Sequence, residues 1–194
     1  HSKPFLEYLV EMLRDQGFKR ILLLLGYLPQ VIQDYFGNGS QWRVEIASVV
    51  SAVEDETARR LKLAEPFLDP YFLLMYCDNY WPMQISKMWS RFVGTNALAM
   101  VTVYSNKDNY SRDCVRIDED GFVVLYDKSR TSPGLKGIEI GYALIDKSIV
   151  ASLPSRNVGF EEAVYPDLAA RRQLLAYTTD HRYYSVGSPD RLPL

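Results

Sequence analysis

The stretch Tyr71-Phe-Leu-Leu-Met-Tyr-Cys-Asp78-Asn79 decides the fold that the sequence predicts. Its apolar and aromatic residues run without alternation, between Asp69-Pro70 and Tyr80-Trp81-Pro82. A continuous apolar run of this length predicts a strand that is buried on both faces. Ligands of α/β proteins gather at the carboxyl ends of such strands. Asp78 at this end is therefore either a strand-terminal turn residue or a metal ligand.

Helical and strand patterns alternate on both sides of this stretch in the first half of the chain. Apolar residues at helical spacing predict helices over residues 4–16, 29–37, 57–67 and 83–93. Between them, apolar runs predict strands over residues 19–27, 44–50, 71–77 and 99–104. This alternation favours a mostly parallel sheet with helices on both faces.

The second half changes character. Two apolar runs, residues 113–117 and 122–127, flank Asp118-Glu-Asp-Gly121, which is a hairpin signal. A strand over 139–146, a helix over 160–171 and strands over 174–178 and 183–186 follow. Because no repeat or linker interrupts the chain, residues 1–194 are expected to form a single α/β domain around a mixed sheet.

Composition excludes several classes of protein. Of the 194 residues 47% are apolar, which excludes a disordered chain. The formal net charge of −2 provides no basic field, so nucleic acid is not an expected partner. The longest apolar run, Ile21 to Leu25, is too short to span a bilayer, so no membrane partner is expected. Cys77 and Cys114 form no CxxC pair and predict two reduced thiols in a cytoplasmic protein.

A set of short motifs occurs in the order known from one enzyme family. The chain resembles the sugar-phosphate nucleotidyltransferases, and within them the mannose-1-phosphate or heptose-1-phosphate guanylyltransferase type. The matching segments span nearly the whole chain: Lys3-Pro4-Phe5-Leu6, Gly26-Tyr27-Leu28, Tyr35-Phe36-Gly37-Asn38-Gly39-Ser40, Cys77-Asp78-Asn79, Tyr126-Asp127-Lys128, Glu139-Ile-Gly141-Tyr, Phe160-Glu161-Glu162 and Val186-Gly187-Ser188-Pro189.

The resemblance implies a Rossmann-like, nucleotide-diphospho-sugar transferase fold. It also implies transfer of a nucleotidyl group from a nucleoside triphosphate, preferably GTP, to a sugar 1-phosphate. The products would be a nucleotide sugar and pyrophosphate, and the cofactor would be Mg²⁺. The sequence does not name the sugar.

Site residues are carried over position by position. Lys3 is similar to the lysine that closes the nucleotide loop and contacts phosphates, and Asp78 to the aspartate that binds the catalytic magnesium. Lys128 matches the lysine that holds the sugar phosphate. The remaining matches line the substrate pocket: Glu139, Gly141 and Glu161.

The chemistry of these residues agrees with the resemblance, although simpler explanations stay open. Magnesium favours one or two carboxylates together with substrate oxygens, and a lysine serves as a point charge for phosphate. Lys128 could instead be a solvated hairpin lysine. Glu161 could complement the dipole of the helix that it begins.

Three departures from the family pattern bear on activity. The family's first strand and its glycine-rich loop would precede Lys3, where only His1-Ser2 stand. Ser185 occupies the position of the second metal carboxylate. The stretch Glu56-Thr57-Ala58-Arg59-Arg60 lacks the glycine that the family has near the base.

These departures predict an N-terminally truncated domain with little or no catalysis. Ile21–Leu25 and Tyr71–Cys77 are expected either to pair directly or to be covered by a second copy of the chain, giving a homodimer. The alternative function is a non-catalytic domain that binds a nucleotide or a sugar phosphate without turnover.

Overall fold

The computed structural model describes residues 3–187. Five helices have bounds close to those that the sequence predicts: α1 Phe5–Asp15, α2 Pro29–Phe36, α3 Thr57–Ala64, α4 Ile85–Phe92 and α6 Phe160–Ala170. The short helix α5, Ser148–Ala151, was not predicted. The strands are β1 Arg20–Leu25, β2 Glu45–Val50, β3 Tyr71–Met75, β4 Asn79–Tyr80, β5 Ala99–Tyr104, β6 Val115–Ile117, β7 Val123–Tyr126, β8 Ile138–Asp146, β9 Leu174–Thr179 and β10 Tyr184–Ser185. No helix within residues 3–187 combines the length and the apolar character needed to cross a bilayer.

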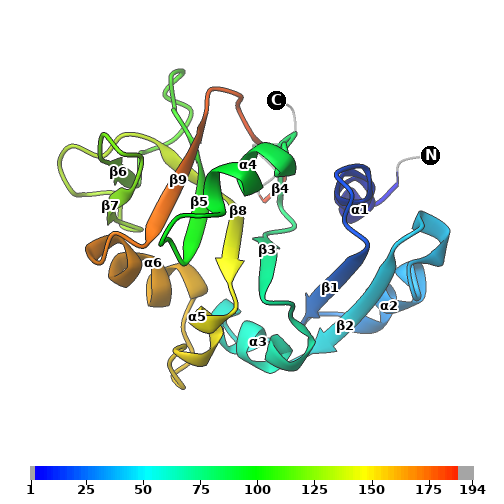
Figure 1. Ribbon diagram of the computed structural model, residues 1–194. Helices are drawn as coiled ribbons and strands as arrows, with labels where there is room; N and C mark the ends of the chain where they lie inside the picture. Colours follow the sequence, from blue (N-terminus) through cyan, green and yellow to red (C-terminus); the bar gives the residue numbers. More distant parts are fainter. Residues whose placement is uncertain (1–2, 188–194) are drawn as a thin grey trace.

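A four-stranded mixed sheet forms the centre of the molecule, in the order β3-β8-β5-β9 (Figure 1). β8 is antiparallel to both of its neighbours, and β5 is parallel to β9. All six residues of β5 are buried, as expected for the middle of a sheet that is covered on both faces. The predicted mixed α/β architecture is confirmed.

Two apolar clusters fill the faces of this sheet. One packs the strands against α3, α5 and α6, and includes Leu61, Val150 and Phe160. The other packs them against α1 and α4, and includes Leu9 and Met88. Apolar spacing along each helix explains this arrangement, since residues three and four apart share one helix face.

A separate two-stranded sheet lies beside the central one. β1 pairs in parallel with β2, from Arg20 opposite Glu45 to Leu25 opposite Val50. A third apolar cluster, which includes Val10, Phe36 and Trp42, packs these two strands against α1 and α2. The chain therefore buries apolar surface on both sides of β1, although only one edge of β1 is paired.

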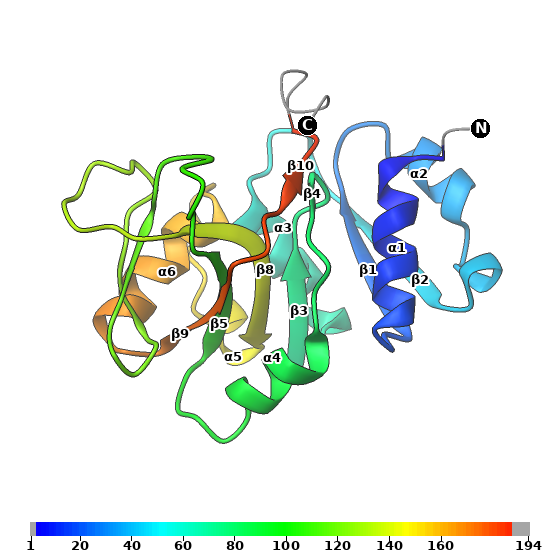
Figure 2. The ribbon, with the colours of Figure 1, turned by 90° about the horizontal axis from the view of Figure 1, so that it is seen from above.

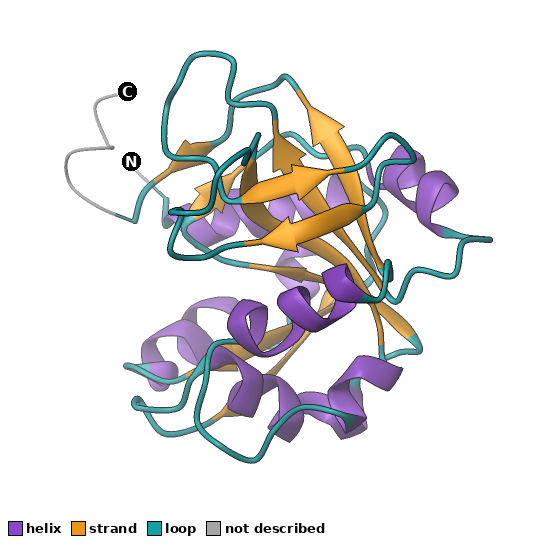
Figure 3. Ribbon diagram, turned by 90° about the vertical axis from the view of Figure 1, so that its left-hand side faces the viewer, coloured by secondary structure: helices purple, strands orange, loops and turns teal. Residues whose placement is uncertain are grey.

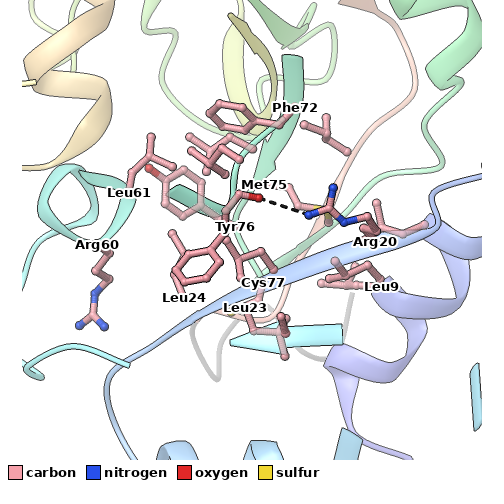
Figure 4. A pocket seen from close by; sticks show the side chains of 18 of the residues that line it. Leu9, Arg20, Leu23, Leu24, Arg60, Leu61, Phe72, Met75, Tyr76 and Cys77 are labelled. Carbon is pink, nitrogen blue, oxygen red and sulfur yellow. Dashed lines mark hydrogen bonds between the residues drawn. The ribbon is translucent and has the colours of Figure 1, made fainter. Parts of the chain in front are cut away.

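The predicted direct pairing of Ile21–Leu25 with Tyr71–Cys77 is wrong. Among residues 3–187, β1 pairs with β2 and β3 pairs with β8, and the edges that β1 and β3 turn toward each other are unpaired. Figure 2 shows the two strands side by side with no strand between them. A cavity of about 520 Å³ lies here, and the side chains labelled in Figure 4 surround it, with Leu9 from α1 and Leu61 from α3.

The same cavity corrects a second expectation. The strand β3 was predicted to be buried on both faces, but Phe72 to Met75 are only half-buried and Tyr71 is 48% exposed. Cys77, predicted to lie inside the strand, is an exposed free thiol beyond its end. The cause is the unpaired edge of β3, because the cavity that runs along it leaves these side chains without close neighbours on that side.

The second half of the chain adds the predicted β6–β7 hairpin, whose short antiparallel strands face the viewer in Figure 3. The loop after β7 leads to β8. Near the carboxyl end of the described residues, β10 pairs antiparallel with β4, with Ser185 opposite Asn79. The β4–β10 pair lies just beyond the carboxyl end of β3.

The cavity between β1 and β3 leads to a packing prediction. Leu22 lines the cavity, so we expect Leu22→Phe to leave the free energy of unfolding within about 1 kcal/mol of the wild type. Val101 in β5 is completely buried, so Val101→Phe should lower it by about 1–3 kcal/mol. Urea denaturation measures both. Equal losses for the two variants would show that the cavity is closed in solution.

Candidate functional site

Asp78 lies just beyond the carboxyl end of β3, where the chain turns toward β4. The backbone N–H of Val186 donates to the carbonyl of Asp78 over 2.8 Å, which fixes the segment after β10 against this turn. Gly187 shows how close the two segments are. A Cβ there would lie 2.9 Å from Asp78 Oδ2 and 3.5 Å from Ser185 Oγ. The structure thus brings together Asp78 and Ser185, the two positions that the resemblance pairs.

A cavity of about 370 Å³ opens beside Asp78. Five of the six predicted site residues line it, and they come from distant parts of the chain: Asp78, Lys128, Glu139, Gly141 and Glu161. We call this space the polar cavity. Its remaining lining residues are Tyr76, Cys77, Asn79, Cys114, Tyr126 and Arg130.

Gly141 shapes the wall that β8 contributes. The pairing of β5 with β8 shifts register between Val101 and Val103, and Gly141 has a φ of +81° at this irregularity. A Cβ at this position would meet the Tyr76 ring at 3.0 Å, so glycine is needed for both its conformation and its size. The bend turns the backbone N–H of Gly141 to Glu139 Oε1, at 2.6 Å.

Glu139 has the most strongly perturbed carboxyl group of the polar cavity. Burial in the cavity wall, together with the charge of Glu161, raises the pKa of Glu139 to about 8. The hydrogen bond from Gly141 and the nearby Arg130 act in the opposite direction. Glu139 is therefore protonated at neutral pH, so it can donate a hydrogen bond as well as accept one.

Lys128 and Glu161 face each other across the polar cavity. Lys128 Nζ lies 3.5 Å from Glu161 Oε2, and the lysine side chain is 57% exposed while that of the glutamate is 15% exposed. Glu161 belongs to the first turn of α6, whose Phe160 N–H donates to Thr57 Oγ1 over 2.7 Å. This geometry fits both readings of Glu161, as a pocket residue and as a partner of the helix dipole.

Lys3 is the predicted site residue that does not line the polar cavity. Its ammonium group pairs with Glu11 and lies 4.0 Å from Glu7, both on α1. It also lies 4.1 Å from the centre of the Tyr8 ring. These contacts hold Lys3 at the start of α1, and its role in nucleotide binding stays a prediction. Ser188 and Pro189 of the last matching motif lie outside the described residues.

Sequence reasoning missed several residues that line the polar cavity. Arg130 gave no motif signal, because its loop has no regular pattern. Cys114 was treated only as a reduced thiol, but it accepts a hydrogen bond from the Glu139 N–H over 3.2 Å, and burial raises the pKa of its thiol to about 11. Tyr76 directly precedes the motif Cys77-Asp78-Asn79, and Tyr126 begins the motif Tyr126-Asp127-Lys128. Their positions beside matched residues were the signal that could have identified them as lining residues.

Within residues 3–187, the acidic side chains do not form a complete metal site by themselves. No group of three or more His, Cys, Asp or Glu side chains in this part of the chain is arranged to hold a metal ion. Asp78 is exposed, with Ser185 Oγ nearby. One carboxylate at a cavity mouth suits Mg²⁺, which takes most of its ligands from water and substrate oxygens.

The raised pKa of Glu139 predicts a pH dependence of stability. Between the ordinary glutamate pKa and about 8, the folded protein binds more protons than the unfolded chain, so the free energy of unfolding falls as pH rises. The slope is at most about 1.4 kcal/mol per pH unit. Glu139→Gln should remove this contribution, whereas Glu162→Gln, at an exposed neighbouring position, should keep it. Urea denaturation from pH 5 to 8.5 tests this, and identical slopes for Glu139→Gln and the wild type would contradict it.

Curated relatives cover nearly all of the chain. D-glycero-alpha-D-manno-heptose 1-phosphate guanylyltransferase of Aneurinibacillus thermoaerophilus is 24% identical over 97% of this chain and 82% of its own length. The probable mannose-1-phosphate guanylyltransferase 1 of rice, Oryza sativa subsp. japonica, is 23% identical over 97% of this chain. The chain spans 54% of the rice protein.

Solved structures show the same fold. The crystal structure of HddC from Yersinia pseudotuberculosis matches with a TM-score of 0.81 and 21% identity, over 99% of this chain and 84% of that one. The structure of HddC complexed with GMP-PN matches with a TM-score of 0.78, over 98% of this chain and 83% of that one. Residues 1–127, more than half of the sequence, match the model of the nucleotidyl transferase family. The chain therefore belongs to the nucleotidyl transferase family.

Proposed function

We propose that this protein serves nucleotidyl transfer from a nucleoside triphosphate, with GTP preferred, to a sugar 1-phosphate. One observation carries the proposal. Five residues that the resemblance selects, from Asp78 to Glu161, line a single polar cavity at the carboxyl end of a sheet strand. Convergence of residues from distant segments on one cavity is the arrangement expected of a substrate site.

The charges of the polar cavity suit a sugar phosphate. Lys128 and Arg130 provide positive charge for the phosphoryl group, and Glu139 and Glu161 can hydrogen-bond sugar hydroxyls. In the reaction, an oxygen of the sugar phosphate attacks the α-phosphorus of the nucleotide. A P–O bond forms there, the bond from the α-phosphorus to the bridging oxygen breaks, and pyrophosphate leaves with that electron pair.

Asp78 is the proposed magnesium ligand. When bound, Mg²⁺ would neutralise the phosphate charges that the reaction brings together. Asp78 supplies an exposed carboxylate within reach of the cavity, and Gly187 leaves open the space that a side chain would fill. Ser185 supplies a hydroxyl, which is a weaker ligand than the carboxylate of the family pattern.

The preference for GTP is supported by relatives, because the heptose and mannose 1-phosphate enzymes named above are guanylyltransferases. HddC, with the same fold, is described as complexed with GMP-PN. The two free cysteines support the proposed cytoplasmic location. A homodimer that covers the gap between β1 and β3 is part of the same proposal, and sedimentation analysis of the molecular mass checks it.

The second candidate is a binding domain without turnover. Ser185 beside Asp78 and the ion pairs of Lys3 favour it, since both weaken the expected phosphate and metal contacts. Calorimetry separates the two candidates. Sugar-phosphate binding without pyrophosphate release would identify a binding domain, and binding of neither nucleotide nor sugar phosphate would contradict both.

The decisive experiment measures pyrophosphate release. We expect release with GTP and mannose or heptose 1-phosphate, slow for the 194-residue chain and faster for a version that carries the family's glycine-rich segment before Lys3. ATP, CTP and UTP serve as comparisons, and Asp78→Asn as the inactive control. Absence of release from both versions with every pair would refute nucleotidyl transfer.

The metal role is tested apart from activity. Ser185→Asp places a second carboxylate beside Asp78, so we expect Mn²⁺ to bind on the order of tenfold more tightly, which corresponds to about 1.4 kcal/mol. In Ser185→Asn the new side chain has the size of aspartate but no charge, so this variant should show no gain in Mn²⁺ affinity. Electron paramagnetic resonance of Mn²⁺ measures the affinity. Equal affinities for the Asp and Asn variants would refute a metal between these positions.

A further inference from the structure

The loop after β7 is organised by one carboxylate. Asp127 Oδ1 accepts hydrogen bonds from the backbone N–H groups of Ser129, at 2.8 Å, and Arg130, at 3.1 Å. Asp127 Oδ2 accepts from those of Thr131, at 2.9 Å, and Ser132, at 2.8 Å. Four consecutive N–H groups therefore converge on a single side chain, and the hydroxyl groups of Ser129 and Thr131 also donate to it.

Backbone contacts fix where this loop starts. The Asp127 N–H donates to the Cys114 carbonyl over 2.8 Å, which ties the loop to the start of β6. The Arg130 N–H also donates to the Asp127 carbonyl over 3.1 Å, and Arg130 has a φ of +59°. That conformation is unfavourable for a residue with a side chain, so the surrounding hydrogen bonds must maintain it.

The loop delivers two cations to the polar cavity. Lys128 and Arg130 both line it, whereas Asp127 does not. Lys128 reaches Glu161 across the cavity, and Arg130 Nη1 donates to Ser111 Oγ over 2.8 Å. Asp127 thus shapes the backbone on which both cations stand without itself facing the ligand space.

We propose that Asp127 is a positioning residue, which holds Lys128 and Arg130 so that both cations meet the phosphoryl group of the sugar phosphate together. The proposal rests on the proposed function in one respect, that the polar cavity takes a sugar 1-phosphate. It assigns Arg130 as a second phosphate contact beside Lys128. It also gives Asp127 of the Tyr126-Asp127-Lys128 motif a role distinct from substrate contact.

A carboxylate is needed at this position. The hydrogen bonds that Asp127 accepts, from the Ser129 hydroxyl first and then from Ser132 and Thr131, hold its pKa far below the usual range. Asp127 therefore stays ionised at every working pH. An asparagine has one accepting oxygen, so it can serve Ser129 and Arg130 but leaves the N–H groups of Thr131 and Ser132 without their acceptor.

The experiment compares Asp127→Ala and Asp127→Asn with a matched control in the same hairpin. The control is Asp118, whose Oδ1 also accepts hydrogen bonds from two loop N–H groups, those of Asp120, at 3.1 Å, and Phe122, at 2.9 Å. Asp118 lies at the opposite end of the hairpin and does not line the polar cavity. Isothermal titration calorimetry with mannose 1-phosphate, and with inorganic phosphate, measures binding to the 194-residue protein. Thermal unfolding measures stability separately.

We expect Asp127→Ala to weaken the binding of both phosphates at least tenfold, and Asp127→Asn to weaken it less. Asp118→Ala should lower the thermal stability but leave both affinities within twofold of the wild-type values. In a protein that already carries Lys128→Ala and Arg130→Ala, Asp127→Ala should cause no further loss. Unchanged affinity in Asp127→Ala, an equal loss in Asp118→Ala, or no binding of either phosphate to the wild type would overturn the proposal. Failure of pyrophosphate release alone would count against turnover and leave this positioning role intact.

Discussion

The pairing of β8 with both β3 and β5 is the constraint on which the rest of the structure depends. β8 comes from the second half of the chain and runs antiparallel between these two strands, which the sequence analysis places in the first half. The irregularity at Gly141 then interrupts this ladder at the carboxyl end of β3. Because the ladder fixes β8 on both sides, the bend can present Glu139 to the polar cavity without disturbing the core.

The polar cavity balances its own charge. Lys128 pairs with Glu161, and Arg130 lies near enough to Glu139 to lower its pKa, while burial keeps Glu139 protonated at neutral pH. The cations and carboxyl groups that the proposed substrate needs thus stabilise one another before it arrives. Such an arrangement favours a ligand that offers both a negative group and hydroxyls, because it must replace both kinds of partner.

Local patterns in the sequence were enough to predict every helix except the short α5, the hairpin and the mixed sheet, since apolar spacing and turn residues determine these directly. Motif order was enough to gather Asp78, Lys128, Glu139, Gly141 and Glu161. The space between β1 and β3 was mispredicted, because strand pairing depends on which edges meet in three dimensions. Arg130 escaped notice for a similar reason: hydrogen bonds to Asp127, rather than any periodic pattern, set its position.

The unpaired edges of β1 and β3 also govern how the molecule can deform. Within residues 3–187, the part formed by α1, β1, α2 and β2 meets the central sheet through apolar side chains and a few polar contacts, such as the Arg20–Asp69 ion pair at 2.9 Å. Apolar contacts are non-directional, whereas a hydrogen-bonded ladder fixes register. No strand pairing therefore fixes this boundary, and the cavity along it reaches Tyr76 and Cys77, next to Asp78. Small rotations about it would shift apolar contacts and break no hydrogen bond between strands, so they cost less than equal rotations between paired strands.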